Sequence, residues 1–159
     1  MIVYHGSTVT VSNPDTAHSF RTLDFGKGFY VTTVREQAER WARRKADLFG
    51  MEKAVLNIYE MVWPSEKLRV KTFDSNLDEW IDFICSCRDG GDQYQKFDVI
   101  CGKVANDRVF QVVDMYRSGI WDKERALQEI KVYPDYDQIA FISQEAIDQL
   151  LIFVRSEEV

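Results

Sequence analysis

Residues that bind metals or cross-link a chain are few in this sequence. Three cysteines and two histidines occur among its 159 residues. An odd number of cysteines cannot all pair within one chain, and no second pair of zinc ligands stands at a usual spacing. The residues concerned are Cys85, Cys87, Cys101, His5 and His18. We therefore predict reduced thiols and a function that needs no metal.

Long apolar runs and an excess of positive charge are also absent. No apolar segment approaches the roughly 18 to 20 residues that cross a bilayer. The first five residues lack the basic segment followed by an apolar one that is typical of a leader. The 20 lysines and arginines are outnumbered by 26 acidic residues, and the net charge of -6 opposes a broad grip on duplex nucleic acid. We expect a cytoplasmic protein that does not bind membranes.

No linker, repeat or low-complexity segment divides the chain. The hydrophobic content of 45% and the aromatic content of 13% are sufficient for one sizeable core. We therefore expect a single domain over residues 1–159.

Hydrophobic periodicity and turn residues predict a chain that alternates between strands and helices. Thr33 and Glu36 have the spacing of a capping box, and Gly50 can end the helix that follows. Asp122 and Ser143 can cap two later helices. The predicted strands cover residues 2–5, 28–32, 54–62, 68–73, 97–101, 138–142 and 151–154, and the remaining helices cover 77–87, 108–117, 122–130 and the residues after 143. Six or seven strands with four or five helices indicate a mixed α/β or α+β fold.

Two motifs combine glycine with groups that bind flat ligands. His5 ends the first predicted strand, and Gly6 and Ser7 follow it with backbone that a planar ligand can approach closely. Taken alone, a strand-end histidine such as His5 is more often just a hydrogen-bonded side chain. The second motif, FGKGFY at residues 25–30, fits neither a phosphate loop nor a dinucleotide fingerprint. Its glycines allow a sharp bend that can present the ring of Tyr30 to a ligand.

Together these motifs resemble the ADP-ribosyltransferase superfamily, in particular the branch shared by poly(ADP-ribose) polymerases and diphtheria toxin. The resemblance implies that His5 binds a ribose hydroxyl and the nicotinamide amide, while the Gly6 backbone holds the carboxamide. It further implies that Tyr30 stacks on the nicotinamide ring and that Gln37, early in the next helix, contacts the carboxamide. The residues expected to bind NAD are His5, Gly6, Ser7, Gly28, Tyr30 and Gln37. The implied fold is a split β-sandwich, in which two small antiparallel sheets with flanking helices enclose an NAD cleft.

The sequence departs from this resemblance at a late strand, where the superfamily has a glutamate and this chain has Gln138. An amide can bind a ribose hydroxyl, but it cannot offset the charge of the oxocarbenium ion that forms as the nicotinamide bond breaks. A unit charge at about 4 Å and an effective dielectric near 20 is worth up to about 4 kcal/mol, or two to three powers of ten in rate. We therefore expect transfer of a single ADP-ribose, with the carboxylate supplied by the acceptor, by Asp137 or by Glu145. The predicted catalytic residues are His5, Tyr30 and Gln138.

Nearly the whole chain also resembles a bacterial family known mainly as a domain of unknown function, with His-Gly-Ser, Asp-Phe-Gly-Lys-Gly-Phe-Tyr and a Gln-Ala helix. This resemblance implies a toxin or effector that a cognate antitoxin protein restrains. The predicted function is thus an NAD-dependent mono-ADP-ribosyltransferase that modifies a protein or a nucleic acid. The alternatives are an NAD glycohydrolase, an RNA 2'-phosphotransferase, and a catalytically degenerate protein that binds NAD or ADP-ribose or acts only through interactions.

Two further segments are open to either a functional or a structural interpretation. Asn106 and Asp107 precede a predicted helix whose N–H groups can face a phosphate, although Asp107 is also a suitable helix cap. The helix after Tyr30 is basic, which suits the NAD diphosphate, a nucleic acid, an acidic partner or simply solvent. Its basic residues are Arg35, Arg40, Arg43, Arg44 and Lys45.

Overall fold

The computed structural model describes residues 1–18, 23–63, 66–74, 76–104, 107–130 and 136–159. Over these residues the chain forms seven strands, five α-helices and one 3-10 turn, in the order β1 β2 α1 β3 β4 α2 η1 β5 α3 α4 β6 α5 β7. The α+β class expected from the sequence is confirmed. Asn106, which the sequence places before a predicted helix, lies outside the described residues.

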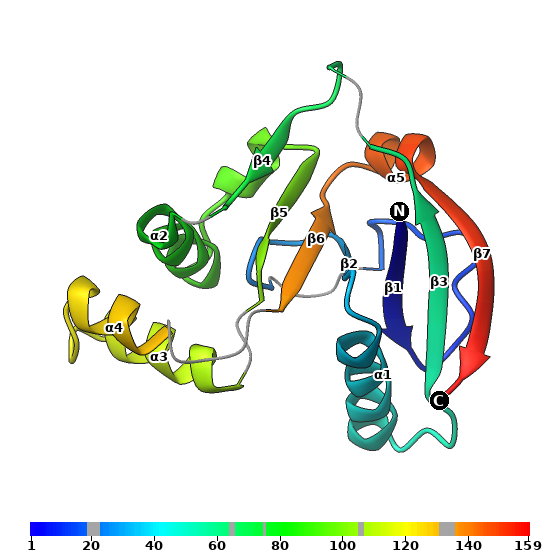
Figure 1. The fold of residues 1–159 in the computed structure, drawn as a ribbon, viewed down its shortest axis with the longest axis horizontal. Helices are drawn as coiled ribbons and strands as arrows, with labels where there is room; N and C mark the ends of the chain where they lie inside the picture. The colour runs from blue at the N-terminus through cyan, green and yellow to red at the C-terminus, as the bar shows by residue number, and fades with distance from the viewer. Residues whose placement is uncertain (19–22, 64–65, 75, 105–106, 131–135) are drawn as a thin grey trace.

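The strands form two sheets that stand side by side (Figure 1). The first sheet has the order β1-β3-β7 and is antiparallel throughout. Its strands are β1 (Ile2–Ser7), β3 (Val55–Met61) and β7 (Leu151–Glu158). The second sheet has the order β2-β6-β5-β4, with β2 (Phe29–Val31), β6 (Asp137–Phe141), β5 (Val99–Lys103) and β4 (Val70–Thr72).

One strand pair corrects the expectation of two antiparallel sheets. β4 runs parallel to β5, with Val70 opposite Val99. Parallel neighbours need a crossover, which a tight turn cannot provide. Here α2 (Leu77–Arg88) and the 3-10 turn η1 (Gln93–Lys96) form that crossover.

A short bridge joins the two sheets. The N–H of Tyr4 in β1 donates to the carbonyl of Thr32 at 2.8 Å, and the N–H of Thr32 donates back to Tyr4 at 2.9 Å. Thr32 directly follows β2, so β1 and β2 become neighbours although they belong to different sheets.

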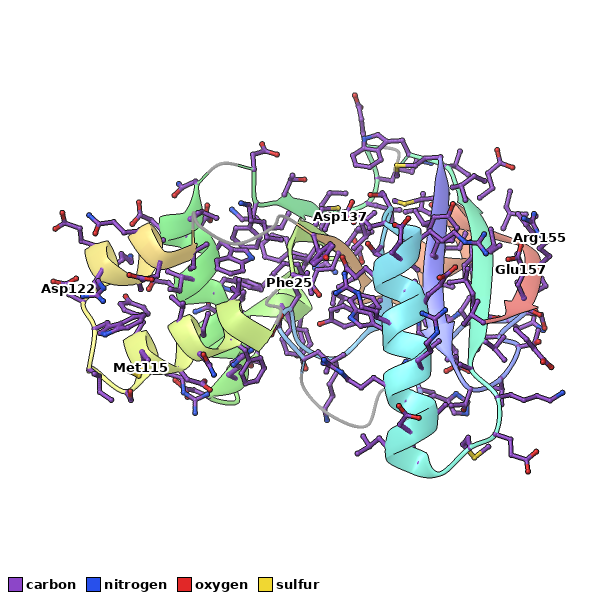
Figure 2. The ribbon with its side chains drawn as sticks, turned by 60° about the horizontal axis from the view of Figure 1, so that its bottom comes forward. Phe25, Met115, Asp122, Asp137, Arg155 and Glu157 are labelled. Atoms are coloured by element: carbon purple, nitrogen blue, oxygen red, sulfur yellow. The ribbon has the colours of Figure 1, made fainter. Side chains whose placement is uncertain are left out.

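Two large apolar clusters lie on the two faces of the second sheet. One fills the space between the sheets and includes Val3, Phe29, Phe141 and the buried side of α5 (Gln144–Leu150). The other packs the opposite face against α2, α3 (Asp107–Arg117) and α4 (Lys123–Ile130), with Trp80 fully buried (Figures 1 and 2). The second sheet is therefore buried on both faces.

The helix α1 (Arg35–Phe49) covers part of the outer face of the first sheet (Figure 2). It ends as expected, because Gly50 adopts the left-handed conformation at φ 62° and donates to the carbonyls of Ala46 and Asp47. The predicted capping box at its start is wrong. The N-cap residue is Val34, and it makes no side-chain cap bond. Thr33 does not cap the helix, because its hydroxyl is bound to Asp137 on β6.

The two later caps are confirmed. The Asp122 carboxylate accepts the N–H of Arg125 at 2.8 Å, and the Ser143 hydroxyl accepts that of Ala146 at 3.2 Å. In the described part of the chain, each helix is too short or too polar to cross a membrane.

Candidate functional site

Three segments that are remote in the sequence lie side by side where the sheets meet. β1 carries His5, β2 carries Tyr30 and β6 carries Gln138. β1 contacts β2 through the bridge described above, and Tyr30 pairs with Ala140, two residues from Gln138. The fold therefore brings the three predicted strands together.

The side chains on these strands are divided between two faces. Successive residues of a strand point to opposite sides of a sheet. Tyr30 belongs to the cluster on the side of α2 and α3, whereas Phe29 belongs to the cluster between the sheets. The ring of His5 stacks on Phe29, with 4.3 Å between the ring centroids. The His5 ring thus lies on the opposite side of the second sheet from the side chains of Tyr30 and Gln138.

The surroundings of His5 fix its protonation and its tautomer. Its Nδ1 lies 2.7 Å from the carbonyl oxygen of Tyr30. Burial, and then the nearby charge of Lys45, lower the pKa of His5 to about 3. The imidazole is therefore neutral at pH 7, and a carbonyl partner requires that Nδ1 carry the proton. Nε2 is left as an acceptor, which suits a hydroxyl donor.

Gly6 is required by close packing. A Cβ at this position would lie 2.1 Å from the carbonyl oxygen of Ala38 in α1, so any larger residue would push the helix away from β1. The Gly6 carbonyl accepts a hydrogen bond from Lys45 Nζ at 2.7 Å. A carboxamide that used this carbonyl would have to share it with the ammonium group or displace it.

Gly28 packs against β6, and Ser7 makes a contact within the turn after β1. A Cβ on Gly28 would lie 2.6 Å from the carbonyl oxygen of Phe141, so glycine permits the close approach of β2 to β6. The Ser7 hydroxyl accepts the N–H of Val9 at 3.5 Å, a weak contact in the turn after β1. Their predicted contacts with NAD stay predictions.

The Tyr30 side chain lies in the core, and only 7% of the residue is exposed. Its hydroxyl donates to the carbonyl of Gly26 at 2.6 Å and accepts the N–H of Phe25 at 3.0 Å. Gly26 adopts φ 88°, a conformation that favours glycine, and its neighbour Tyr94 leaves no room for a Cβ. Tyr30 therefore holds the glycine turn in shape, and its ring would have to leave the core to stack on a ligand.

Gln138 is buried, and the donors of its amide are engaged. Nε2 donates to the carbonyl of Lys103 at 2.8 Å and to the Asp24 carboxylate at 3.4 Å. Because both partners are acceptors, the amide atom that faces them must be the nitrogen. Oε1 is then the atom that can accept a hydrogen bond from a hydroxyl. Asp24 also pairs with Arg88 at 3.0 Å.

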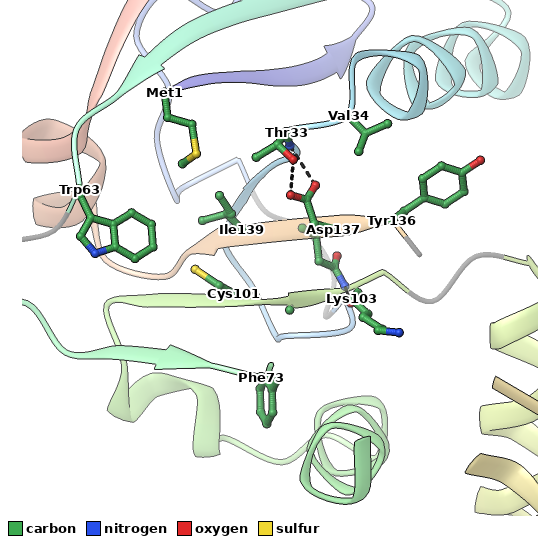
Figure 3. A pocket seen from close by; sticks show the side chains of 12 residues that line it. Met1, Thr33, Val34, Trp63, Phe73, Cys101, Lys103, Tyr136, Asp137 and Ile139 are labelled. Carbon is green, nitrogen blue, oxygen red and sulfur yellow. Dashed lines mark hydrogen bonds between the residues drawn. The ribbon is translucent and has the colours of Figure 1, made fainter. Parts of the chain in front are cut away.

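Asp137 links β6 to the segment between β2 and α1. Its Oδ1 accepts from the Thr32 hydroxyl at 2.6 Å and from the Thr33 N–H at 2.9 Å, and its Oδ2 accepts from the Thr33 hydroxyl. Its backbone carbonyl accepts from Gln37 Nε2 at 3.0 Å. This carboxylate is only partly buried, and Figure 3 shows it directed at Thr33.

The side-chain oxygen of Gln37 has no hydrogen-bond donor among the described residues. The residue is 3% exposed, and its Oε1 is buried with no hydrogen-bond partner among the described residues. The bond from Nε2 to the Asp137 carbonyl excludes a flipped amide, because a flip would turn two oxygens toward each other. An unpaired buried acceptor costs about 1 to 3 kcal/mol and calls for a functional or structural explanation.

A cavity of about 500 Å³ opens beside Asp137, between the start of the first sheet and the strands β5 and β6 (Figure 3). Its volume falls in the range of small-molecule sites. The lining residues are Met1, Thr33, Val34, Trp63, Phe73, Cys101, Gly102, Lys103, Tyr136, Asp137, Gln138 and Ile139. Gln138 thus lines this cavity, whereas His5 and Tyr30 are not part of the wall that the described residues form.

The polar groups of the cavity wall include the carboxylate of Asp137 and the amide of Gln138. Burial raises the pKa of the Cys101 thiol to about 12, so this cysteine is neutral at pH 7 and is a poor nucleophile. Glu145, the other carboxylate considered from the sequence, is exposed on α5 and binds Gln149 at 2.9 Å. Within the part of the chain that is described, no three His, Cys, Asp or Glu side chains form a group able to hold a metal ion.

The basic residues of α1 mostly have partners within the chain. Arg35 pairs with Glu39 at 2.8 Å and also with Glu157. The guanidinium of Arg40 lies 5.0 Å from the centre of the Tyr136 ring, at the edge of the cavity. These contacts favour a structured surface over a free phosphate-binding strip.

Two residues near the motifs were not singled out from the sequence. Asp24 is the first residue of the Asp-Phe-Gly-Lys-Gly-Phe-Tyr motif, but no role was expected of it. Lys45 was noted only as one of several basic residues, because its contact with Gly6 spans 39 residues.

Comparison with known proteins finds a match to a family model. No curated protein and no solved structure matches the chain. A family model described as a protein of unknown function, DUF3990, matches residues 1–152. Because this match covers nearly the whole chain, the protein belongs to the DUF3990 family.

Proposed function

We propose that this protein is an NAD-dependent mono-ADP-ribosyltransferase. The proposal rests on the resemblance of the His5, Gly6 and FGKGFY motifs, and on the meeting of their strands with β6 at one junction. The acceptor would be a protein or a nucleic acid. The toxin role and the restraining antitoxin rest on the resemblance alone.

The unpaired Oε1 of Gln37 is the observation that carries the proposal. The superfamily resemblance assigns this position to the nicotinamide carboxamide, whose NH₂ group is a donor. A buried acceptor without a donor is the complementary group. Two residues next to Gln37 line the cavity. Val34 lies three residues before Gln37, and the backbone carbonyl of Asp137 accepts a hydrogen bond from the amide nitrogen of Gln37. Gln37 itself is absent from the lining residues, so a carboxamide would have to displace part of this wall to reach Oε1.

The negative charge that Gln138 lacks has a candidate source in Asp137. This carboxylate lines the cavity, and Glu145 is exposed on α5. Asp137 is held by two hydroxyls and one N–H, so its position is set before a substrate binds. Preorganised charge of this kind stabilises an oxocarbenium ion without reorganisation.

The reaction breaks the bond between ribose C1' and the nicotinamide nitrogen, and the electron pair leaves with nicotinamide. A lone pair of the acceptor forms the new bond to C1', and the proton of the acceptor is lost to water. NAD and acceptor thus give ADP-ribosyl acceptor, nicotinamide and a proton. In this step Gln138 Oε1 would accept a hydrogen bond from a ribose hydroxyl, which helps to fix the sugar for attack, whereas His5 could take part only through a contact on the other side of the sheet.

The test is incubation of the protein with NAD labelled in its adenylate half, with and without cell extract. Label that becomes attached to protein or nucleic acid supports transfer, and release of free ADP-ribose alone supports a glycohydrolase. When a 2'-phosphorylated RNA is added, transfer of its phosphate to the ADP-ribose of the labelled NAD, with release of nicotinamide and the 2'-hydroxyl RNA, would support the phosphotransferase alternative. The Asp137→Asn variant is the matched inactive control.

A second candidate is a catalytically degenerate protein that binds NAD or ADP-ribose. It is favoured by the amide at position 138 and by the core position of the Tyr30 ring, because both remove features that the superfamily uses. Calorimetric NAD binding without any turnover, in the same preparation, would support this candidate over the transferase.

A further inference from the structure

Asp24 lies at the centre of a buried polar group on the α2 side of the second sheet. Its Oδ1 is 3.0 Å from the guanidinium of Arg88, and its Oδ2 is 3.4 Å from Nε2 of Gln138. The side chains of Asp24 and Arg88 are 13% and 9% exposed. Arg88 also lies over the ring of Phe110, 3.4 Å from its centroid. A carboxylate is thus held against the amide that stands where a glutamate is expected.

The glycine motif positions this carboxylate. The N–H of Gly26 donates to the Leu23 carbonyl at 3.1 Å, and this turn contains Asp24. Tyr30 fastens the turn through its two hydroxyl contacts with Phe25 and Gly26. The FGKGFY motif therefore acts here as a support that holds Asp24 beside Gln138.

The amide of Gln138 transmits the effect of the charge behind it. The Asp24 carboxylate and the Lys103 carbonyl both accept hydrogen bonds from Nε2 of Gln138, so Oε1 of Gln138 points away from them. An amide polarised by an anion at its N–H carries more negative charge on its oxygen. Arg88 offsets part of the Asp24 charge.

We propose that Asp24 is a positioning residue of the site, which orients Gln138 and adds negative charge behind its amide, in addition to the charge of Asp137. The inference rests on the proposed function, since it concerns the same cleavage of NAD. It changes no bond in that reaction. Asp24 would stabilise the positive charge at C1' through the amide, without touching the substrate.

The test compares four proteins in single-turnover cleavage of NAD at saturating substrate: the unchanged chain, Asp24→Asn, Asp24→Asn with Gln138→Glu, and Asp114→Asn. Asp24→Asn keeps the shape and should lower the rate about tenfold, the order expected when one partly offset charge is removed at an effective dielectric near 20. Gln138→Glu in that background returns the charge and should restore the rate. Asp114 is the exposed second partner of Arg88, at 3.3 Å, so its variant should be unchanged.

The pH profile adds a readout that a purely structural role would not move. In the unchanged background, Gln138→Glu sets two carboxylates at the distance of the present contact, and one of them stays protonated at neutral pH. Its rate should then rise with pH, whereas the double variant should show no such rise. Circular dichroism and melting curves establish that each variant is folded.

The outcomes separate the inference from the function beneath it. If the unchanged chain does not cleave NAD, both the proposed function and the role of Asp24 are overturned. If it cleaves NAD and Asp24→Asn does so at the same rate, only the role of Asp24 is overturned. A folded double variant that remains slow also overturns it, because Asp24 would then be a structural partner of Arg88.

Discussion

Replacing Gln37 by methionine separates the binding role of this residue from its contribution to stability. Methionine matches glutamine in length and helix propensity but has no amide. The unpaired Oε1 costs the folded state about 1 to 3 kcal/mol, and the bond from Nε2 to the Asp137 carbonyl returns about 0.5 to 1.5 kcal/mol. Gln37→Met should therefore leave the free energy of unfolding unchanged or raise it by up to about 2 kcal/mol. For a chain of this length, that is a rise in Tm of up to about 6 °C.

The same substitution should weaken ligand binding. One hydrogen bond to the carboxamide is worth about 0.5 to 1.5 kcal/mol, so Kd for NAD should rise about 2-fold to 12-fold. Urea unfolding and calorimetry with NAD measure the two effects. Gln144→Met is the matched control, because this α5 amide is satisfied by Thr16, Pro14 and Asp148. The control should lose stability and keep its NAD affinity, and the same pattern in Gln37→Met would refute the reasoning.

Three further substitutions test the contacts around the site. Tyr30→Phe removes both hydroxyl contacts from the core and should lower the free energy of unfolding by about 1 to 3 kcal/mol in urea; a stable variant would mean that the glycine turn does not depend on the hydroxyl. Burial lowers the pKa of His5 to about 3, so below about pH 6.5 the unfolded chain binds a proton that the folded chain does not. Stability should therefore fall as pH drops from 6.5 toward 3, by up to about 1.4 kcal/mol per pH unit; His5→Gln should flatten this slope, and exposed His18→Gln should keep it. Gly6→Ala should destabilise the fold by more than about 3 kcal/mol, because its Cβ meets helix backbone, whereas Gly90→Ala, with open space around it, should cost only about 1 kcal/mol; equal melting curves would contradict the close approach of β1 and α1.

Local sequence signals were sufficient for the order of strands and helices. Gly50, Asp122 and Ser143 act on residues within one helical turn, so their effects can be read from the sequence. Thr33 fails as a cap because Asp137, 104 residues later, competes for its hydroxyl. The parallel pairing of β4 with β5 was likewise not predictable, since strand direction depends on where α2 packs.

The site shows the same division between local and distant information. Sequence reasoning selected His5, Tyr30 and Gln138, and their strands are neighbours in the fold. The face on which each side chain lies depends on the register of the sheet, and a shift of one residue would reverse it. For that reason the opposite orientation of His5 and the partnership of Asp24 with Gln138 needed three-dimensional structure.

The bridge between Tyr4 and Thr32 has a consequence for dynamics. It consists of two backbone hydrogen bonds, whereas β1 and β3 pair along six residues. Each sheet therefore has more hydrogen bonds internally than to the other, so separation of the sheets breaks few hydrogen bonds, although it exposes the apolar cluster between them. Amide hydrogen exchange at Tyr4 and Thr32 should consequently be faster than within β3, and a ligand that spans Gln37 and Asp137 should slow it. The junction would then be the part of the molecule whose mobility reports on occupancy of the site.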